Sequence, residues 1–340
     1  MKISGQINSI QILRGIAALV VLLSHANHKT VQLGIQDANI FSWGGIGVDI
    51  FFIISGFIMM LVTNKDSSKL QFISNRIIRI IPAYWTVSFL ALGVYLIAPS
   101  LVNSSGGQTG IIQSFTLIKI PFDIKFLVQN GWTLTFEFFF YLTFIFFINR
   151  SGSQKVFLTF ILFLFIDIVF LSTGEGIRSF LNDPIKYEFI FGAALFLIYS
   201  GSLKEKVFGL LLIISASFAA KLFSVSIAVR TIEFGLPALF FVGGLISIEQ
   251  LLLKYKDKIK YPLFLGEISY SLYLIHPFIQ TIAILTKKIF FLQYSPLFYF
   301  LVILFSMIAS CIFHHLIEKK LTMKIKESLV LKSRFKSRVE

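Results

Sequence analysis

The stretch at residues 7–28, INSIQILRGIAALVVLLSHANH, decides how the rest of the chain is interpreted. It is apolar enough to enter a membrane, yet it contains two ionisable side chains, Arg14 and His25. They are about three helical turns apart, so we expect them on nearly one face, separated by about 16 Å along the axis. Ionisable residues within a spanning helix are costly and usually functional, so the pair predicts a polar path through the membrane. Alternatively, Arg14 reaches the inner headgroups and His25 ends the helix on the outer side.

Composition places the whole chain in a membrane. Hydrophobic residues make up 56% of the 340 residues and charged residues only 14%, against about 25% charged residues in a typical soluble protein. The single cysteine, Cys311, excludes an intramolecular disulfide and a zinc–thiolate site, and we expect no metal. We attribute the net charge of +14 to loops on the cytoplasmic side and expect no nucleic-acid partner.

Hydropathy predicts an all-α, polytopic bundle of about ten transmembrane helices with no soluble domain. The ten apolar segments are residues 9–28, 44–63, 80–98, 128–148, 156–172, 185–200, 207–223, 231–249, 262–285 and 296–317. Most of the 31 Lys and Arg residues then fall on the side of the N-terminus, which predicts an N-in, C-in orientation. We expect residues 1–320 to form the membrane domain and residues 321–340 a basic cytoplasmic tail on inner-leaflet lipid.

The second segment opens as GGIGVDIFFIISGF (residues 44–57) and carries a carboxylate. Asp49 is expected near the depth of His25, where it would orient the imidazole of a general base. The alternative is a surface ion pair between Asp49 and Lys29. The glycines of this segment, together with Ser55, permit close helix packing.

Two arginines stand three positions apart in NRIIRIIPAYW (residues 75–85). Arg76 and Arg79 therefore share one face of a helix at the cytoplasmic interface. Such a pair can clamp the phosphates of a nucleotide-containing donor, or it can serve only the positive-inside topology. We expect Pro82 to begin the next span and Tyr84 to lie at the interface.

Two more ionisable residues lie deep in apolar segments. Glu137 is the only charged residue of GWTLTFEFFFYLTF (residues 131–144), where a carboxylate needs a partner or a proton; the alternative is a structural ion pair with Arg or Lys. His276 is followed by Pro277 in SYSLYLIHPF, and its apolar neighbours also fit a buried structural histidine.

Four segments thus contribute to one predicted polar pocket or tunnel through the bundle. Its members are Arg14, His25, Asp49, Glu137 and His276. One histidine with nearby carboxylates, and an arginine pair on the cytoplasmic side, suits group transfer from an anionic cytoplasmic donor.

Together these motifs resemble the acyltransferase-3 family of integral membrane O-acyltransferases, from about Ile7 to Glu318. LRGIAALVVLLSHA has the family's Arg-then-His spacing, and NRIIRIIPAYW has its paired arginines. WTLTFEFFFY matches the tryptophan-to-glutamate segment, and SYSLYLIHPF the late histidine segment. The forms SIQILRGIAAL and GVDIFFIISGF are most similar to the exopolysaccharide O-acetylation branch.

The resemblance implies a ten-helix protein of the bacterial cytoplasmic (inner) membrane that uses cytoplasmic acetyl-CoA. It implies acetylation of a sugar hydroxyl on an envelope or exported polysaccharide, or on its lipid-linked precursor, with polysaccharide-assembly proteins as possible partners. By motif match, His25 is the catalytic base supported by Arg14, and Arg76 and Arg79 bind the donor. Glu137 corresponds to the family's buried glutamate, which structures the pocket. The residues expected to line the substrate pocket are Asp49, Ser55, Tyr84, Trp132 and His276.

Two other classes of function remain open at this point. A transporter or proton-coupled exporter of a lipid-linked sugar would share the buried charges but would leave the CoA thioester intact. The lack of a clear internal repeat counts against it, and Glu137 counts against a purely structural scaffold. A covalent acetyl-histidine relay at His25 is a mechanistic variant of the acyltransferase.

Overall fold

The computed structural model describes residues 7–32, 41–63, 65–102, 107–120, 123–224, 229–290 and 295–336. Its longer helices are α1 (Asn8–Gln32), α2 (Ile46–Val62), α3 (Lys69–Ile97), α6 (Gly131–Phe144), α7 (Gly152–Val169), α9 (Tyr187–Ser200), α10 (Leu203–Phe223), α11 (Leu236–Ser247), α14 (Ser269–Phe290), α15 (Ser295–Phe313) and α16 (Lys319–Lys336). Short helices are α4 (Pro99–Val102), α5 (Ile111–Thr116), α8 (Glu175–Leu181), α12 (Glu249–Lys254) and α13 (Lys260–Glu267). The 3₁₀ turns are η1 (Ser42–Gly45), η2 (Ile145–Phe147), η3 (Pro184–Lys186) and η5 (Lys256–Ile259), and the π turns are η4 (Thr231–Gly235) and η6 (His314–Glu318).

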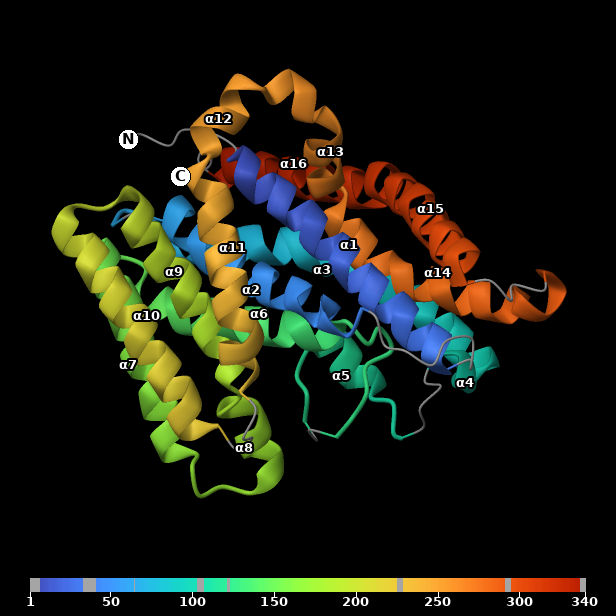
Figure 1. The fold of residues 1–340 in the computed structure, drawn as a ribbon, viewed down its shortest axis with the longest axis horizontal. Coiled ribbons are helices and arrows are strands. Elements are labelled where there is room, and N and C mark those ends of the chain that lie inside the picture. The colour runs from blue at the N-terminus through green and yellow to red at the C-terminus, as the bar shows by residue number, and fades with distance from the viewer. Residues whose placement is uncertain are drawn as a thin grey trace.

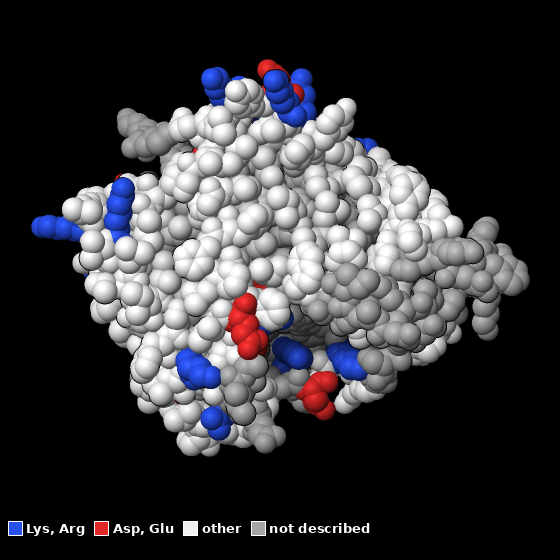
Figure 2. Space-filling view, in the orientation of Figure 1, with Lys and Arg blue, Asp and Glu red and all other residues white. Residues whose placement is uncertain are grey.

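The described residues are helical apart from loops and one isolated bridge between Thr109 and Lys125, so the all-α prediction is confirmed. In Figure 1, α7, α9 and α10 form one side of the bundle, and α1, α14 and α15 form the other. Helix α11 passes in front of α2 between the two sides. The charged side chains visible in Figure 2 gather at the upper, left and lower edges, and a broad uncharged band lies between them, as expected of a membrane protein.

Each of the ten predicted segments contains a helix, but not every helix is long enough to cross a bilayer. Six stretches of the described residues are sufficiently long and apolar: Asn8–Val31, Trp43–Val62, Lys69–Ile97, Gly152–Val169, Leu203–Phe223 and Pro296–Ser328. Gly131–Phe147 and Thr231–Ser247 are apolar but shorter. The count of ten spans, the N-in, C-in orientation and the domain division at residue 320 therefore stay predictions.

The third span begins earlier than expected. Helix α3 starts at Lys69 because the Ser68 side chain accepts a hydrogen bond from Gln71 N at its N-terminus. Pro82, expected to begin the span, lies inside this helix. Thr86 Oγ1 donates to the Pro82 carbonyl oxygen at 2.8 Å, and proline is tolerated inside membrane helices. Arg76 and Arg79 are consequently part of the spanning helix itself.

Glycines set the close crossings of α2 with its neighbours. A Cβ atom on Gly56 would lie 2.1 Å from the Phe189 carbonyl oxygen, and one on Gly192 would lie 1.8 Å from the Ile53 carbonyl oxygen. A Cβ on Gly47 would lie 2.5 Å from the Ala17 carbonyl oxygen. No side chain fits at these positions, which confirms the predicted close packing of the second segment.

The start of α1 is fixed by a carboxylate from α12. The backbone nitrogens of Asn8 and Ser9 donate to the two carboxylate oxygens of Glu249 at 2.9 and 2.7 Å. These nitrogens have no partner within the helix, and a negative charge at this end also interacts favourably with the positive end of the helix dipole. The cap sets the position of α1, and with it the depth of Arg14 and His25.

Candidate active site

The first candidate cavity, which we call the arginine pocket, lies between α1, α2, α3, α6 and α14 and has a volume of about 90 Å³. Its polar lining consists of Arg14, Ser55, Arg76, Arg79, Thr133, Glu137, Tyr141, Tyr270 and Tyr273. Three guanidinium groups therefore surround a single carboxylate. The pocket suits an anionic or strongly polar ligand group.

Glu137 is held in the arginine pocket by hydroxyl groups. Ser55 Oγ donates to Glu137 Oε1 at 2.9 Å, and the Tyr141 hydroxyl donates to the same oxygen. No Lys or Arg nitrogen among the described residues lies within 4.0 Å of this carboxylate, although Arg14 interacts with it electrostatically. The alternative of a tight structural ion pair therefore does not apply to Glu137.

Arg76 reaches out of the arginine pocket on one side. It also lines a cavity of about 200 Å³ at the α2–α3 turn, together with Ser67, Ser68, Gln71 and Asn75. The Nε atom of Arg76 is buried and has no hydrogen-bond partner. Buried donors are nearly always paired, so a missing partner indicates that an acceptor binds there.

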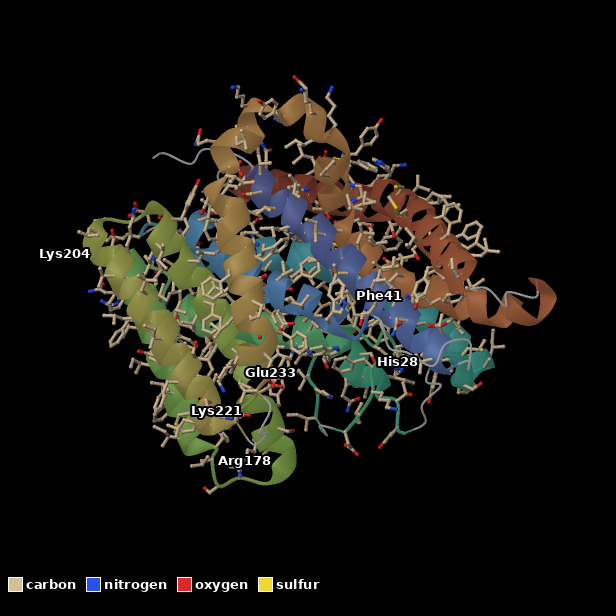
Figure 3. The ribbon with its side chains drawn as sticks, in the orientation of Figure 1. His28, Phe41, Arg178, Lys204, Lys221 and Glu233 are labelled. Atoms are coloured by element: carbon tan, nitrogen blue, oxygen red, sulfur yellow. The ribbon has the colours of Figure 1, made fainter. Side chains whose placement is uncertain are left out.

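The second cavity, which we call the histidine pocket, has a volume of about 380 Å³ and lies between α1, α3, α4, α14 and the segment before α6. Its polar lining consists of His25, His28, Lys29, Gln129, Asn130, Gln280 and Thr281. In Figure 3, His28 lies in the lower part of the molecule, as do Glu233, Lys221 and Arg178. Lys204 lies at the upper left. The surface of the lower part is hollowed between Glu233 and His28 (Figures 2 and 3).

The two pockets share no lining residue among those that the structure describes, so the predicted members do not line one common pocket, and the alternative of a tunnel stays a prediction. Tyr273 stands between them. Its hydroxyl lies 2.9 Å from Thr133 Oγ1 in the arginine pocket, and its carbonyl oxygen accepts from Asn130 Nδ2 of the histidine pocket at 2.7 Å. Tyr273 thus contacts residues of both pockets.

His25 is paired with His276. His25 Nδ1 lies 3.0 Å from His276 Nε2, and His276 Nδ1 lies 2.8 Å from the Leu272 carbonyl oxygen. A carbonyl oxygen only accepts, so His276 Nδ1 carries the hydrogen. With both rings neutral, His276 Nε2 accepts from His25 Nδ1–H, which leaves the lone pair on His25 Nε2. His276 is fully buried, and His25 is the ring of the pair that lines the pocket.

Asp49, by contrast, does not orient His25, and this prediction is wrong. Arg230 donates from Nε to Asp49 Oδ1 at 3.0 Å and from Nη2 to Oδ2 at 2.8 Å, and a third bond reaches the Gly45 carbonyl oxygen at 3.0 Å. Asp49 is fully buried and lines neither pocket. Because Arg230 takes both carboxylate oxygens, the alternative pair with Lys29 also does not form.

The other expected pocket residues are scattered. Ser55 lines the arginine pocket. Tyr84 is buried, with its hydroxyl unpaired, and a Cβ on Gly131 would lie 2.5 Å from that hydroxyl. Trp132 lines a separate cavity on another side of α6. The predicted substrate set therefore does not share one pocket.

Sequence reasoning missed several pocket residues. Tyr141 was detectable, because it follows Glu137 by one helical turn within the same apolar segment. Tyr273 lies one turn before His276 and was detectable in the same way. No local signal marks Asn130 or Gln280. Asn130 Nδ2 donates to the Tyr273 carbonyl oxygen of α14, and Gln280 Nε2 donates to the Leu22 carbonyl oxygen of α1, so tertiary packing places both at the histidine pocket.

Residues 7–315 match the family model described as an acyltransferase domain. The chain belongs to the acyltransferase-3 family. Over 274 residues it is 31% identical to the exopolysaccharide production protein ExoZ of Rhizobium meliloti, which covers 76% of this chain and 81% of that protein. Over 142 residues it is 30% identical to the acyltransferase MdmB of Streptomyces mycarofaciens, covering 39% of this chain and 36% of that protein.

No solved structure matches the chain. The family match confirms the resemblance drawn from the motifs, and with the apolar helices it identifies a membrane acyltransferase.

Proposed function

We propose that the protein is an O-acyltransferase of the bacterial cytoplasmic membrane that transfers an acetyl group from cytoplasmic acetyl-CoA to a sugar hydroxyl of an envelope or exported polysaccharide or its lipid-linked precursor. The observation that carries the proposal is the His25–His276 pair, which leaves a basic nitrogen at a cavity of about 380 Å³. The likeness to ExoZ, named for exopolysaccharide production, supports the class of acceptor.

The arginine side of the bundle is suited to the donor. CoA carries several phosphate charges, and the guanidiniums of Arg76 and Arg79 offer planar, charge-assisted donors for them. The arginine pocket, at about 90 Å³, is too small for a nucleotide. We place the phosphates at the larger cavity beside Arg76 and only the narrow thioester arm in the arginine pocket.

The reaction follows from the tautomer of the histidine pair. His25 Nε2 takes the proton of the acceptor hydroxyl while that oxygen attacks the thioester carbonyl carbon. The carbon–sulfur bond then breaks, and the CoA thiolate takes the proton back from His25 to leave as the free thiol. His276 Nε2 keeps the hydrogen bond from His25 Nδ1–H throughout and favours the transient imidazolium. General-base assistance of this kind typically contributes about 10²–10⁴-fold in rate.

The test is acetyl-CoA turnover by the purified protein in lipid nanodiscs, with de-O-acetylated exopolysaccharide as acceptor. We expect thioester loss matched by ester gain in the wild type and a fall of at least about 100-fold in His25→Ala. The matched control is His315→Ala, since His315 is exposed and lines neither pocket. Ester formation that survives in His25→Ala removes His25 from the chemistry. Passage of a labelled lipid-linked sugar across the bilayer with the thioester intact favours the transporter.

A further inference from the structure

The start of α6 separates three cavities. Successive residues of an α-helix project about 100° apart, so the two turns at residues 130–137 present different side chains to different sides. Glu137 lines the arginine pocket, and Asn130 lines the histidine pocket. Trp132 and Thr135 line a third cavity of about 130 Å³, which we call the tryptophan cavity. Neither the histidine pair nor the arginines contribute to it.

The apolar part of the tryptophan cavity is a fixed aromatic surface. Trp132 packs edge-on against Phe136, with ring centroids 6.0 Å apart and planes at 86°. Phe136 in turn lies 4.8 Å from Phe180 of α8. These contacts hold the half-buried Trp132 ring in place, so an aromatic face is available without a large cost in side-chain entropy.

The polar part of the tryptophan cavity is supplied by Lys119, Ser179 and Asp183. Asp183 Oδ1 accepts from Ile185 N at 2.9 Å, which fixes the carboxylate at the start of η3. Ser179 Oγ donates to the Gly176 carbonyl oxygen at 2.8 Å and keeps its acceptor capacity. Burial raises the pKa of the Asp183 carboxyl above its usual range. Charged and hydroxyl groups thus stand beside an aromatic face.

This combination matches the chemistry of a sugar ring. A pyranose presents C–H groups on its faces, which pack on aromatic rings, and hydroxyls around its edge, which bind carboxylates, ammonium groups and other hydroxyls. The volume of the cavity admits about one such ring. Its position also fits, because Asn130 of the histidine pocket and Trp132 both stand at the N-terminal end of α6, so the two cavities lie on different sides of the same helix end.

We propose that the tryptophan cavity binds a further sugar residue of an extended acceptor, whose acylated residue lies in the histidine pocket. This inference rests on the proposed function, since it assigns the acceptor as a saccharide of at least two residues. Binding at both cavities would fix which hydroxyl of the repeat faces His25.

The test compares acceptors of increasing length. The probes are mono-, di- and tetrasaccharide fractions of de-O-acetylated exopolysaccharide, bound to the wild-type protein and its variants in nanodiscs and followed by titration calorimetry. We expect the wild type to bind the tetrasaccharide about tenfold more tightly than the monosaccharide. Trp132→Ala should abolish this length dependence, Trp132→Phe should keep most of it, and Asp183→Asn should reduce it. The KM for acetyl-CoA should stay unchanged in all three variants.

Each other outcome overturns the subsite. The subsite is overturned if the wild type does not bind the saccharides or binds all lengths equally. It is also overturned if Trp132→Ala keeps the full length dependence. A raised KM for acetyl-CoA in Trp132→Ala would assign the cavity to the adenine base of CoA instead. Thermal unfolding of each variant, with Trp132→Phe as the conservative replacement, separates lost binding from lost fold. Acetyl transfer without length dependence removes the subsite alone, whereas length-dependent binding without thioester loss removes only the transfer activity.

Discussion

Two pairs of polar side chains inside the bundle, Asp49–Arg230 and His25–His276, look alike in sequence. They differ in whether a hydrogen-bonding atom remains unused. In the Asp49–Arg230 pair, both carboxylate oxygens are bound, and the guanidinium also reaches the Gly45 carbonyl oxygen. In the His25–His276 pair, each contact uses one ring nitrogen, and one nitrogen of His25 stays unused beside a cavity. A buried ionisable residue therefore indicates a reactive site only when a lone pair remains next to space for a ligand.

The two pairs also differ in the charged side chains that surround them. Glu188 interacts electrostatically with Asp49 and Arg230, and its side chain is fully buried beside them. Arg230 thus serves two carboxyl groups where α2, η4 and α9 meet, and it stabilises the packing there. The histidine pair contacts no acidic side chain among the described residues, and His25 Nε2 stays available to exchange a proton with a ligand.

The largest effect should come from removing the acceptor that orients His25. In His276→Leu we expect kcat to fall about 100-fold, with an unchanged KM for acetyl-CoA, because His25 then loses the tautomer that leaves Nε2 free. His276→Gln should stay within about tenfold of the wild type, since its side-chain oxygen can accept from His25 Nδ1–H. The measurements are kcat, KM and the pH–rate profile. If the pH–rate profile and kcat are unaltered in His276→Leu, the His25–His276 pair serves only to hold the fold together, as the Asp49–Arg230 pair does.

Breaking the Asp49–Arg230 pair should cost stability and leave catalysis intact. Removing one partner of a buried pair costs about 3–5 kcal/mol, but the Arg230 side chain is 38% exposed, so we expect a smaller cost, about 1–3 kcal/mol, for Asp49→Asn. The double variant Asp49→Asn with Arg230→Gln should recover part of this loss. Thermal unfolding in nanodiscs measures the stability, and turnover per folded protein measures the activity. A drop in kcat at normal stability would return Asp49 to the active site.

The comparison extends to arginines, because Arg230 has its partners and Arg76 Nε has none. In Arg76→Gln we expect the KM for acetyl-CoA to rise about tenfold, or about 1.4 kcal/mol, with a smaller change in kcat. The effect should shrink at high salt as the phosphate charges are screened. Arg150→Gln is the matched control, since Arg150 is exposed on a loop and lines none of these cavities. Equal effects in the two variants would mean that Arg76 contributes only to topology.

The sequence was sufficient to predict the helices and to single out the ionisable residues within them. It was not sufficient to predict which side chains those residues contact. Apolar length predicts a spanning helix directly, and the depths of Arg14 and Glu137 follow from their positions in such segments. The partner of Asp49 lies 181 positions away, and that of His25 lies 251 positions away. These pairings depend on how α1 packs on α14 and α2 packs on η4, which local patterns do not encode.

The smallest effect concerns the carboxylate of the arginine pocket, Glu137. Asp49 is bound by a cation, whereas Glu137 Oε1 accepts from two neutral hydroxyls, those of Ser55 and Tyr141. Ser55→Ala removes one of these two donors, and a single hydrogen bond contributes about 0.5–1.5 kcal/mol. We therefore expect a threefold to tenfold rise in the KM for acetyl-CoA, and a comparable rise in Tyr141→Phe. Because the two donors share one acceptor oxygen, the combined variant should cost more than the sum of the single changes. Strictly additive effects would mean that the two hydroxyls do not act through Glu137. The carboxylate would then only occupy space in the arginine pocket and would not position the other groups that line it.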